Sequence, residues 1–159
     1  MVGEKKPGSN VLFFIEWKYT EEYGDNDKYI PARYEIYNPL LEDEHSPIVV
    51  EDYRSLYYEP FYQLMRQTLL GWKMVEDGEN HYDEWIHVHV IPEGNVEMRE
   101  RVTSPGLRLR GTNMSDVWKS VLRDPARYMT ITPEEFLRPA CGCPDMHSIA
   151  AYLEKRYWS

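Results

Sequence analysis

The order of apolar and charged segments predicts a single mixed α/β domain. An apolar, strand-like run begins at Val11, an amphipathic helix covers 58–75, a second alternating strand covers 84–92, and short helices complete the chain. The 159 residues, 42% of them apolar and 14% aromatic, are enough for one hydrophobic core. We therefore expect one domain over the whole chain, with a polar, frayed start at 1–10 and a C-terminal helix within 144–159.

The acidic composition limits the partners of the chain. With 27 acidic and 18 basic residues the net charge is −9, which argues against sequence-blind adhesion to nucleic acid or anionic membranes but allows a local basic site. No apolar run approaches the ~20 residues that span a bilayer, and residues 1–10 lack the apolar core of a signal peptide. We therefore expect a cytoplasmic protein with no membrane partner.

The first strand is expected in the stretch 11–24, VLFFIEWKYTEEYG. A run this rich in β-branched and aromatic residues belongs in a sheet covered on at least one side, and its side chains alternate between the faces. One face holds Phe14, Glu16 and Lys18, and the other holds Phe13, Ile15, Trp17 and Tyr19. The Cα atoms of Glu16 and Lys18 lie roughly 6.6 Å apart on one partly enclosed face. The two side chains therefore form either an ion pair or a joint site for one ion, water or phosphate.

Two helices are expected next. After a charged surface loop at 20–28, apolar spacing over 31–42 predicts a short helix interrupted near Pro39. The clearest helix of the chain covers 58–75, with Pro60 in its first turn. Its apolar stripe consists of Phe61, Leu64, Met65, Thr68, Leu69 and Trp72, and its polar stripe consists of Glu59, Gln63, Arg66 and Gln67. The apolar stripe must pack on another element.

The second strand places two histidines on one face. Its faces are Ile86, Val88 and Val90 on one side and Trp85, His87, His89 and Ile91 on the other. The His-x-His spacing occurs in zinc sites, but no third ligand is evident, so a half-exposed sheet face is the preferred interpretation. Cys141 and Cys143 with His147 form an incomplete zinc knuckle, so ordinary reduced thiols are expected there.

The rest of the chain combines a basic segment with short helices. Residues 96–110 alternate weakly, which favours a solvated strand, although their arginines could instead contact a nucleic-acid backbone together with Arg66. These arginines are Arg99, Arg101, Arg108 and Arg110. Helices are expected from a cap at Ser115 to about Leu122, from a start at Thr132-Pro133 with Glu135, and over 145–157.

A strand that carries Glu-x-Lys, followed by a helix with glutamines in its polar stripe, resembles the PD-(D/E)xK superfamily of restriction-endonuclease-like phosphodiesterases. The segments Glu16-Trp17-Lys18-Tyr19-Thr20-Glu21, Tyr58-Glu59-Pro60 and Tyr62-Gln63-Leu64-Met65-Arg66-Gln67 are similar to those of a bacterial group within it. The likeness covers residues 11–140. It implies a restriction-endonuclease-like mixed sheet flanked by helices.

The resemblance also implies a chemistry, the cleavage of DNA with the help of Mg²⁺ or Mn²⁺. In this superfamily an upstream aspartate and the acid of the Glu-x-Lys strand hold the ion. By resemblance, Glu16 would be the metal ligand, and Lys18 would position or deprotonate the attacking water. Gln63 or Gln67 would support the site from the helix. DNA would be contacted only locally, by the arginines named above, and an RNA substrate stays open.

The chain departs from the superfamily at the upstream acid. No aspartate precedes Asp25, and residues 1–10 contain Glu4 as their one acid. Three expectations follow: an N-terminally shortened domain, a substitute acid such as Glu4 or Glu21, or a domain without cleavage that binds nucleic acid or a protein partner. A zinc-binding module built on the two histidines is a further alternative. Sheet edges exposed by shortening would favour a homodimer.

Overall fold

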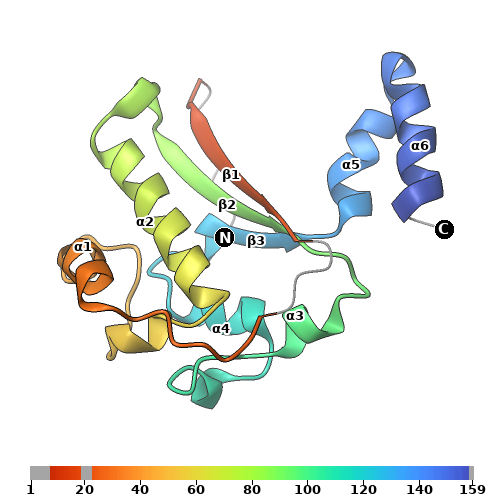
Figure 1. The fold of residues 1–159 in the computed structure, drawn as a ribbon. Coiled ribbons are helices and arrows are strands. Elements are labelled where there is room, and N and C mark those ends of the chain that lie inside the picture. Colours follow the sequence, from red (N-terminus) through yellow and green to blue (C-terminus); the bar gives the residue numbers. More distant parts are fainter. Residues whose placement is uncertain (1–7, 19–22, 158–159) are drawn as a thin grey trace.

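Three parallel strands form the sheet at the centre of the fold. The structure is a computed structural model that describes residues 8–18 and 23–157. Strands β1 (Val11–Trp17), β2 (Glu84–Val90) and β3 (Tyr128–Ile131) lie in the order β1-β2-β3, and both pairings are parallel. Helices flank this small sheet (Figure 1), so the predicted α/β class is confirmed. Strand β3 was not expected, because its four residues are too few to show an alternating pattern.

The helices of the described residues follow the predicted order closely. They are α1 (Pro31–Leu41), α2 (Phe61–Glu76), α3 (Val96–Glu100), α4 (Met114–Ser120), α5 (Pro133–Cys141) and α6 (His147–Tyr157). The predicted interruption near Pro39 is wrong, because α1 continues through Pro39 to Leu41. Pro60 is the N-cap of α2. None of the helices in the described ranges is both long and apolar enough to cross a bilayer.

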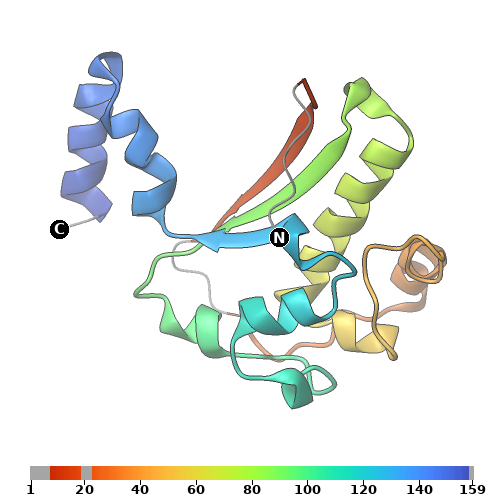
Figure 2. The same cartoon turned by 180° about the vertical axis from the view of Figure 1, so that it is seen from behind.

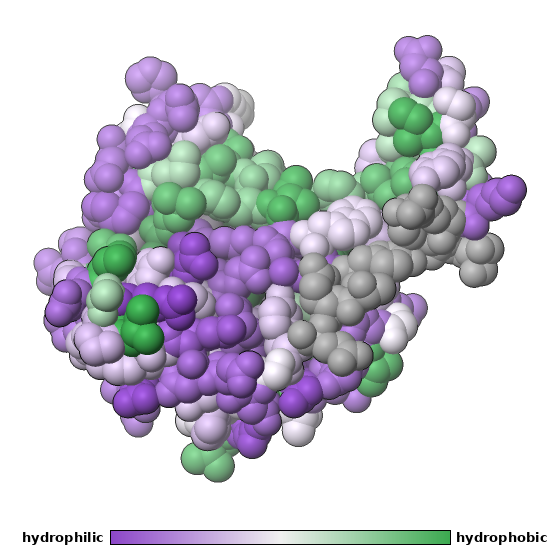
Figure 3. Space-filling view, viewed as in Figure 1, coloured by the Kyte–Doolittle hydropathy of each residue, from purple (hydrophilic) through white to green (hydrophobic). Residues whose placement is uncertain are grey.

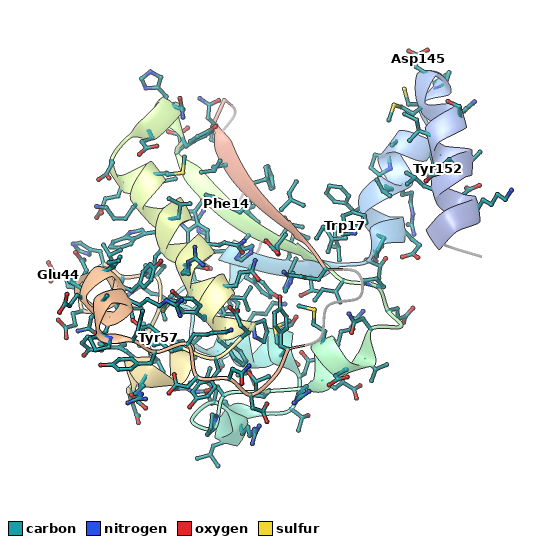
Figure 4. All side chains as sticks on the ribbon, in the orientation of Figure 1. Phe14, Trp17, Glu44, Tyr57, Asp145 and Tyr152 are labelled. Carbon is teal, nitrogen blue, oxygen red and sulfur yellow. The ribbon has the colours of Figure 1, made fainter. Side chains whose placement is uncertain are left out.

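Helix α2 runs across one face of the sheet, in the connection between β1 and β2 (Figures 1 and 2). We call this the inner face; by strand register it carries Leu12, Phe14, Glu16, Trp85, His87, His89, Tyr128 and Thr130. The helix approaches β1 closely at Gly71, where an added Cβ would lie 2.5 Å from Cε2 of Phe14. Figure 4 shows Phe14 beside α2. Glycine is therefore needed at this point of contact.

The hydrophobic core lies beneath α2 and extends to α4. The buried side chains of the predicted apolar stripe, Phe61, Leu64, Met65 and Leu69, belong to it. Its aromatic side chains also pack on one another. The rings of Tyr57 and Tyr62, for example, are stacked with their centroids 5.5 Å apart. Trp118 of α4 is fully buried, and the centroid of its ring lies 6.3 Å from that of Phe61. The core thus fixes α2 over the sheet.

The other face of the sheet, the outer face, is unexpectedly exposed at its edge strands. Phe13, Ile15 and Trp17 of β1 are 50%, 51% and 37% exposed, and Met129 of β3 is 41% exposed. Figure 3 shows apolar residues along the hollow between the sheet and the α5–α6 pair. The covered face of β1 is therefore the one with Glu16 and Lys18. The apolar face is covered less well, because α2 packs on the other side.

Two predicted features of the strands need correction. His87 and His89 do not lie on a half-exposed face, because α2 covers them and they are 0% and 1% exposed. Strand β1 ends at Trp17, one residue before Lys18, although the Lys18 backbone N–H still donates to Val90 at 2.9 Å. The predicted position of Tyr19 lies outside the described residues. β1 and β3 are the edges of the described sheet, so pairing with a second copy stays a prediction.

Two predictions for the later chain are also corrected. Residues 96–110 contain α3 and a 3₁₀ turn at Arg108–Arg110, where a solvated strand was predicted, because Asn95 caps a helix by accepting from the Met98 backbone N–H. Helix α4 begins two residues earlier than predicted, after Asn113, which caps it. Ser115 lies inside that helix and shares a hydrogen bond with Thr130 of β3.

The C-terminal helices meet the sheet at one end. The predicted start of α5 is confirmed: Thr132 and Glu135 form a reciprocal capping box, with Pro133 at the first position. Trp17 on the outer face packs edge to face with Phe136 of α5, with ring centroids 5.8 Å apart. From this contact, α5 and α6 extend away from the sheet (Figures 1 and 4). Cys141 and Cys143 are free thiols, as expected.

Candidate functional site

Glu16 and Lys18 lie at the carboxyl end of β1, on the side covered by α2. Ligand sites in open α/β sheets commonly lie at this end of parallel strands. The Lys18 ammonium contacts the Glu16 carboxylate, with Nζ 2.7 Å from Oε1. Their side chains are 10% and 18% exposed, so the pair is enclosed in part, as the sequence predicted.

Two glutamines of α2 complete this arrangement. Gln63 Nε2 donates to Glu16 Oε1 at 2.8 Å, and Gln67 Nε2 donates to Oε2 at 2.5 Å. Both residues lie on one side of α2 because they are four positions apart. We call Glu16, Lys18, Gln63 and Gln67 the Glu16 cluster. The four residues that the sequence named as catalytic therefore meet in space, and both glutamines, rather than one, reach the carboxylate.

The charges of the Glu16 cluster support one another. Burial acts to raise the pKa of Glu16, but the hydrogen bonds of Lys18 and Gln67 and the charge of Lys18 outweigh it, so the pKa lies below its usual range. Burial acts to lower the pKa of Lys18, yet hydrogen bonds and charges from Glu16 and Tyr23 raise it. At neutral pH, Glu16 is therefore a carboxylate and Lys18 an ammonium group that can donate hydrogen bonds.

A buried polar layer extends the inner face beyond Glu16. His89 is the register partner of Glu16 on β2, and Thr130 is the partner of His89 on β3. His89 Nδ1 lies 2.9 Å from the Tyr128 hydroxyl, while Nε2 of His89 and both ring nitrogens of His87 have no hydrogen-bond partner among the residues that the structure describes. Burial is the main cause that lowers the pKa of His87 to about 4 and of His89 to about 3. Both rings are therefore neutral at pH 7.

Sequence reasoning missed this layer for a physical reason. The alternation in β2 predicts that His87 and His89 share a face, but it does not say which strand lies beside them. Only the parallel register, with Glu16 opposite His89, brings the histidines to the cluster. One feature of the sequence could have indicated the layer: Tyr128 and Thr130 alternate with apolar residues in the last strand and therefore point the same way.

The predicted basic segment is tied to the rest of the fold by ion pairs and hydrogen bonds. Arg101 and Arg108 converge on Asp25, with nitrogen–oxygen distances of 3.2 and 3.3 Å. Arg108 also donates to the carbonyl oxygens of Val102 and Thr103. These contacts hold the chain together in this region, and a contact of the same groups with nucleic acid stays a prediction.

The remaining arginines of the prediction are divided between two places. Arg110 donates to the Ser120 carbonyl at 3.3 Å, and Arg99 is half-buried. Arg66 is exposed on α2, and its guanidinium carbon lies 5.4 Å from the centre of the Tyr62 ring. The structure therefore places Arg66 on the helix of the Glu16 cluster, whereas the other four lie on or near α3 and the 3₁₀ turn after it.

A pocket of about 360 Å³ opens beside the Glu16 cluster, between α1 and α2. It is lined by Tyr37, Leu40, Gln63, Arg66, Gln67, Leu69, Leu70 and Lys73. Gln63 and Gln67 thus contact both the pocket and Glu16. The sequence did not reveal this pocket, because the contact between α1 and α2 is not local in the chain.

The cluster fits a divalent cation only in part. Mg²⁺ prefers oxygen ligands and usually takes one or two carboxylates together with water or phosphate oxygens. Within residues 8–18 and 23–157, no three His, Cys, Asp or Glu side chains are arranged to hold a metal ion. Glu16 can provide one anionic ligand, and Glu4 and Glu21, the suggested substitutes, lie outside the described residues. A second anionic oxygen must therefore come from elsewhere.

Comparison with known proteins gives one family. A family model described as Restriction Endonuclease associating with ARP, abbreviated REase-ARP, matches residues 3–158. No curated protein and no solved structure matches the chain. The matched range covers the sheet, all the helices described above and the Glu16 cluster.

Proposed function

The chain belongs to the REase-ARP family of restriction endonuclease-associated proteins, and from this membership and the Glu16 cluster we propose that it is a metal-dependent DNA phosphodiesterase of the PD-(D/E)xK type. The family description connects the chain with restriction endonucleases. The reaction, the metal and the DNA substrate are the proposal itself.

The observation that carries the proposal is the convergence of the Glu16 cluster. Gln63 and Gln67 are 47 and 51 positions from Glu16 in the chain, and both bond to its carboxylate. An ordinary surface ion pair needs no such support and contributes little to stability. Three donors directed at one enclosed carboxylate hold its oxygens in a fixed position, which a metal ligand or a water-binding group requires.

The protonation states of the pair suggest distinct roles. Glu16 is the anionic group, with a lowered pKa, and would be the ligand for Mg²⁺ or Mn²⁺. Lys18, with its raised pKa, stays protonated and therefore would position the attacking water or contact the phosphate rather than remove a proton. The bound ion would neutralise phosphate charge and make water more acidic. The second anionic ligand could be a phosphate oxygen of the substrate itself.

A second candidate function is a nuclease-fold domain that binds nucleic acid or a protein without cutting. The observation that favours it is that Lys18, Gln63 and Gln67 already occupy three acceptor sites of the Glu16 carboxylate. The family description speaks of association with ARP. In this second proposal, a protein of that kind would be the partner.

Cleavage of supercoiled plasmid DNA with Mg²⁺ or Mn²⁺ distinguishes the two candidates. Glu16→Gln and Lys18→Met keep the size of each side chain and remove its charge, so we expect both to abolish metal-dependent cutting. Glu93→Gln and Lys119→Met make the same changes outside the cluster and should leave cutting unchanged. Glu93 is exposed and Lys119 is half-buried in α4.

The outcomes separate the candidates clearly. Cutting by the unaltered protein that survives in Glu16→Gln would contradict the proposed site, because it would come from elsewhere. A complete lack of cutting with either metal, in a protein that still binds DNA, would instead support the second candidate. Loss of cutting in the two control variants would show a general effect of charge rather than a role of the cluster.

A further inference from the structure

The pocket between α1 and α2 combines apolar and aromatic side chains with polar and basic ones. We propose that it takes one unpaired base of a nucleic-acid strand, with the adjoining phosphate bound by Arg66. This inference rests on the proposed function, because it names the form of nucleic acid that would be presented to the Glu16 cluster. It assigns a second contact surface, distinct from the arginines around Asp25.

The size and lining of the pocket set the class of ligand. Its volume of about 360 Å³ lies at the lower end of the range of small-molecule sites, which suits a single base. Leu40, Leu69 and Leu70 form apolar walls, and Tyr37 adds an aromatic ring. A base in a duplex is held in its stack, so only a single-stranded or extruded base can enter such a pocket.

The charge beside the pocket favours a phosphate over a purely apolar ligand. Arg66 is exposed, and the Tyr62 ring lies 5.4 Å from its guanidinium carbon, a cation–π contact that orients the group. Arg33 of α1 lies at the same distance from that ring. Lys73 also lines the pocket, but Glu76 and Asp77 neutralise it at 2.5 and 3.1 Å. Arg66 is therefore the cation best placed to bind a phosphate.

The two glutamines connect this pocket to the proposed chemistry. Gln63 and Gln67 line the pocket and also donate to Glu16. A nucleotide in the pocket would therefore be separated from the carboxylate by one layer of side chains. Amide groups can both donate to and accept from the edge of a base. The substrate class is accordingly DNA or RNA with an unpaired segment.

Fluorescence anisotropy with labelled oligonucleotides in EDTA tests the inference without cleavage. We expect the unaltered protein to bind a single strand about tenfold more tightly than the matching blunt duplex, as stacking in one pocket would give. Arg66→Ala removes the phosphate contact, and Leu70→Glu places a negative charge at a position that is 54% exposed. Each should weaken binding of the single strand about tenfold.

Matched changes outside the pocket provide the controls. Arg138→Ala removes an exposed arginine of α5, and Leu109→Glu adds a carboxylate at a leucine that is 95% exposed; neither residue lines this pocket. Both should keep the affinity of the unaltered protein within twofold. Circular dichroism should show that all four variants are folded.

Several results would overturn the inference. These are equal affinity for single strand and duplex, no binding of either, or equal losses in the control variants. Loss of binding in Leu70→Glu with no effect of Arg66→Ala would contradict the proposed phosphate contact of Arg66. Because binding is measured without metal, pocket-dependent binding by a protein that never cuts would contradict only the nuclease proposal. Plasmid cutting that is unaffected by the pocket variants, with no preference for single strands, would contradict only the pocket.

Discussion

The two faces of the sheet use their side chains in opposite ways. The inner face, under α2, is well covered and yet holds Glu16, His87 and His89, whose burial costs free energy. The outer face carries apolar side chains at its edge strands, and about half of the Phe13 and Ile15 surface remains exposed. Hydrophobic burial alone would arrange the two faces the other way round.

This difference shows where the fold serves something other than its own stability. Buried polar groups without complete hydrogen bonding are rare and require an explanation. Here the rings of His87 and His89 lie on the same face as Glu16, the carboxylate that three donors hold in place. The outer face contains apolar side chains and no comparable polar cluster among the described residues. The inner face is therefore the place to test function, and the outer face is the natural control.

The largest expected effect is a loss of stability in mild acid, caused by the two inner-face histidines. The unfolded chain protonates each histidine near pH 6.5, whereas the folded protein holds the pKa of His87 at about 4 and of His89 at about 3. Between these values the unfolded state binds more protons, so stability falls as the pH decreases. The expected slope is about 1.4 kcal/mol per pH unit for each histidine.

Urea unfolding measured from pH 7.5 to 4.5 checks this slope. His87→Phe removes one of the two buried imidazoles and should halve the loss of stability between pH 7.5 and 4.5. His45→Phe changes a histidine that is 73% exposed and should leave the slope unaltered. An identical slope in His87→Phe and the unaltered protein would contradict the account of the inner face.

A smaller effect is expected from Lys18→Met. The change leaves the Glu16 carboxylate enclosed without its cation, so the free energy of unfolding at pH 7 should fall by about 1 to 2 kcal/mol. The pKa of Glu16 should rise, since Lys18 is the main group that lowers it. The lowered pKa of Glu16 stabilises the folded protein at pH values above the pKa that this carboxyl has in the unfolded chain. The stabilisation is lost as the pH falls through the pKa of Glu16 in the folded protein.

Carbon-detected NMR titration of Glu16 and urea unfolding measure the two consequences. Lys73→Met is the matched control, because Lys73 also has carboxylate partners, but on the surface, where such pairs contribute little. Its loss should stay below about 0.5 kcal/mol. Equal losses in both lysine variants would show that the Glu16 pair is no more than a surface ion pair.

The smallest effect is expected on the outer face. Ile15 is 51% exposed, so Ile15→Ala should cost less than about 1 kcal/mol, whereas Leu64→Ala beneath α2, at 1% exposed, should cost about 3 kcal/mol. Thermal unfolding of both variants gives the comparison. A large loss in Ile15→Ala, close to that of Leu64→Ala, would mean that the outer face is covered in solution, for example by a second copy of the chain.

The local patterns in the sequence predicted much of this arrangement. The alternation in 11–24 placed Glu16 and Lys18 on one face, and the helical spacing of 58–75 placed Gln63 and Gln67 on one stripe, because both periodicities are properties of adjacent residues. Neither pattern states which face of β1 the helix covers, since both faces contain apolar residues. That choice depends on Gly71, which lets α2 approach Phe14.

Contacts between distant segments account for what the sequence did not predict. The position of His89 beside Glu16 depends on strand register, and the pairing of Arg101 and Arg108 with Asp25 depends on how two loops meet. An alternating segment with four arginines looks the same whether these groups face solvent or a carboxylate. Charge pattern alone therefore did not reveal that two of these arginines pair with Asp25.

The two glutamines give the carboxylate a support that can change its direction. A lysine can only donate a hydrogen bond and a carboxylate can only accept one, whereas an amide does either after a half-turn about its last bond. Gln63 and Gln67 now present nitrogen to Glu16. The same side chains could present oxygen to a cation or to the water around it. Gln63 and Gln67 can thus face either an anion or a cation. Glutamate at positions 63 and 67 could only accept hydrogen bonds, and lysine could only donate them.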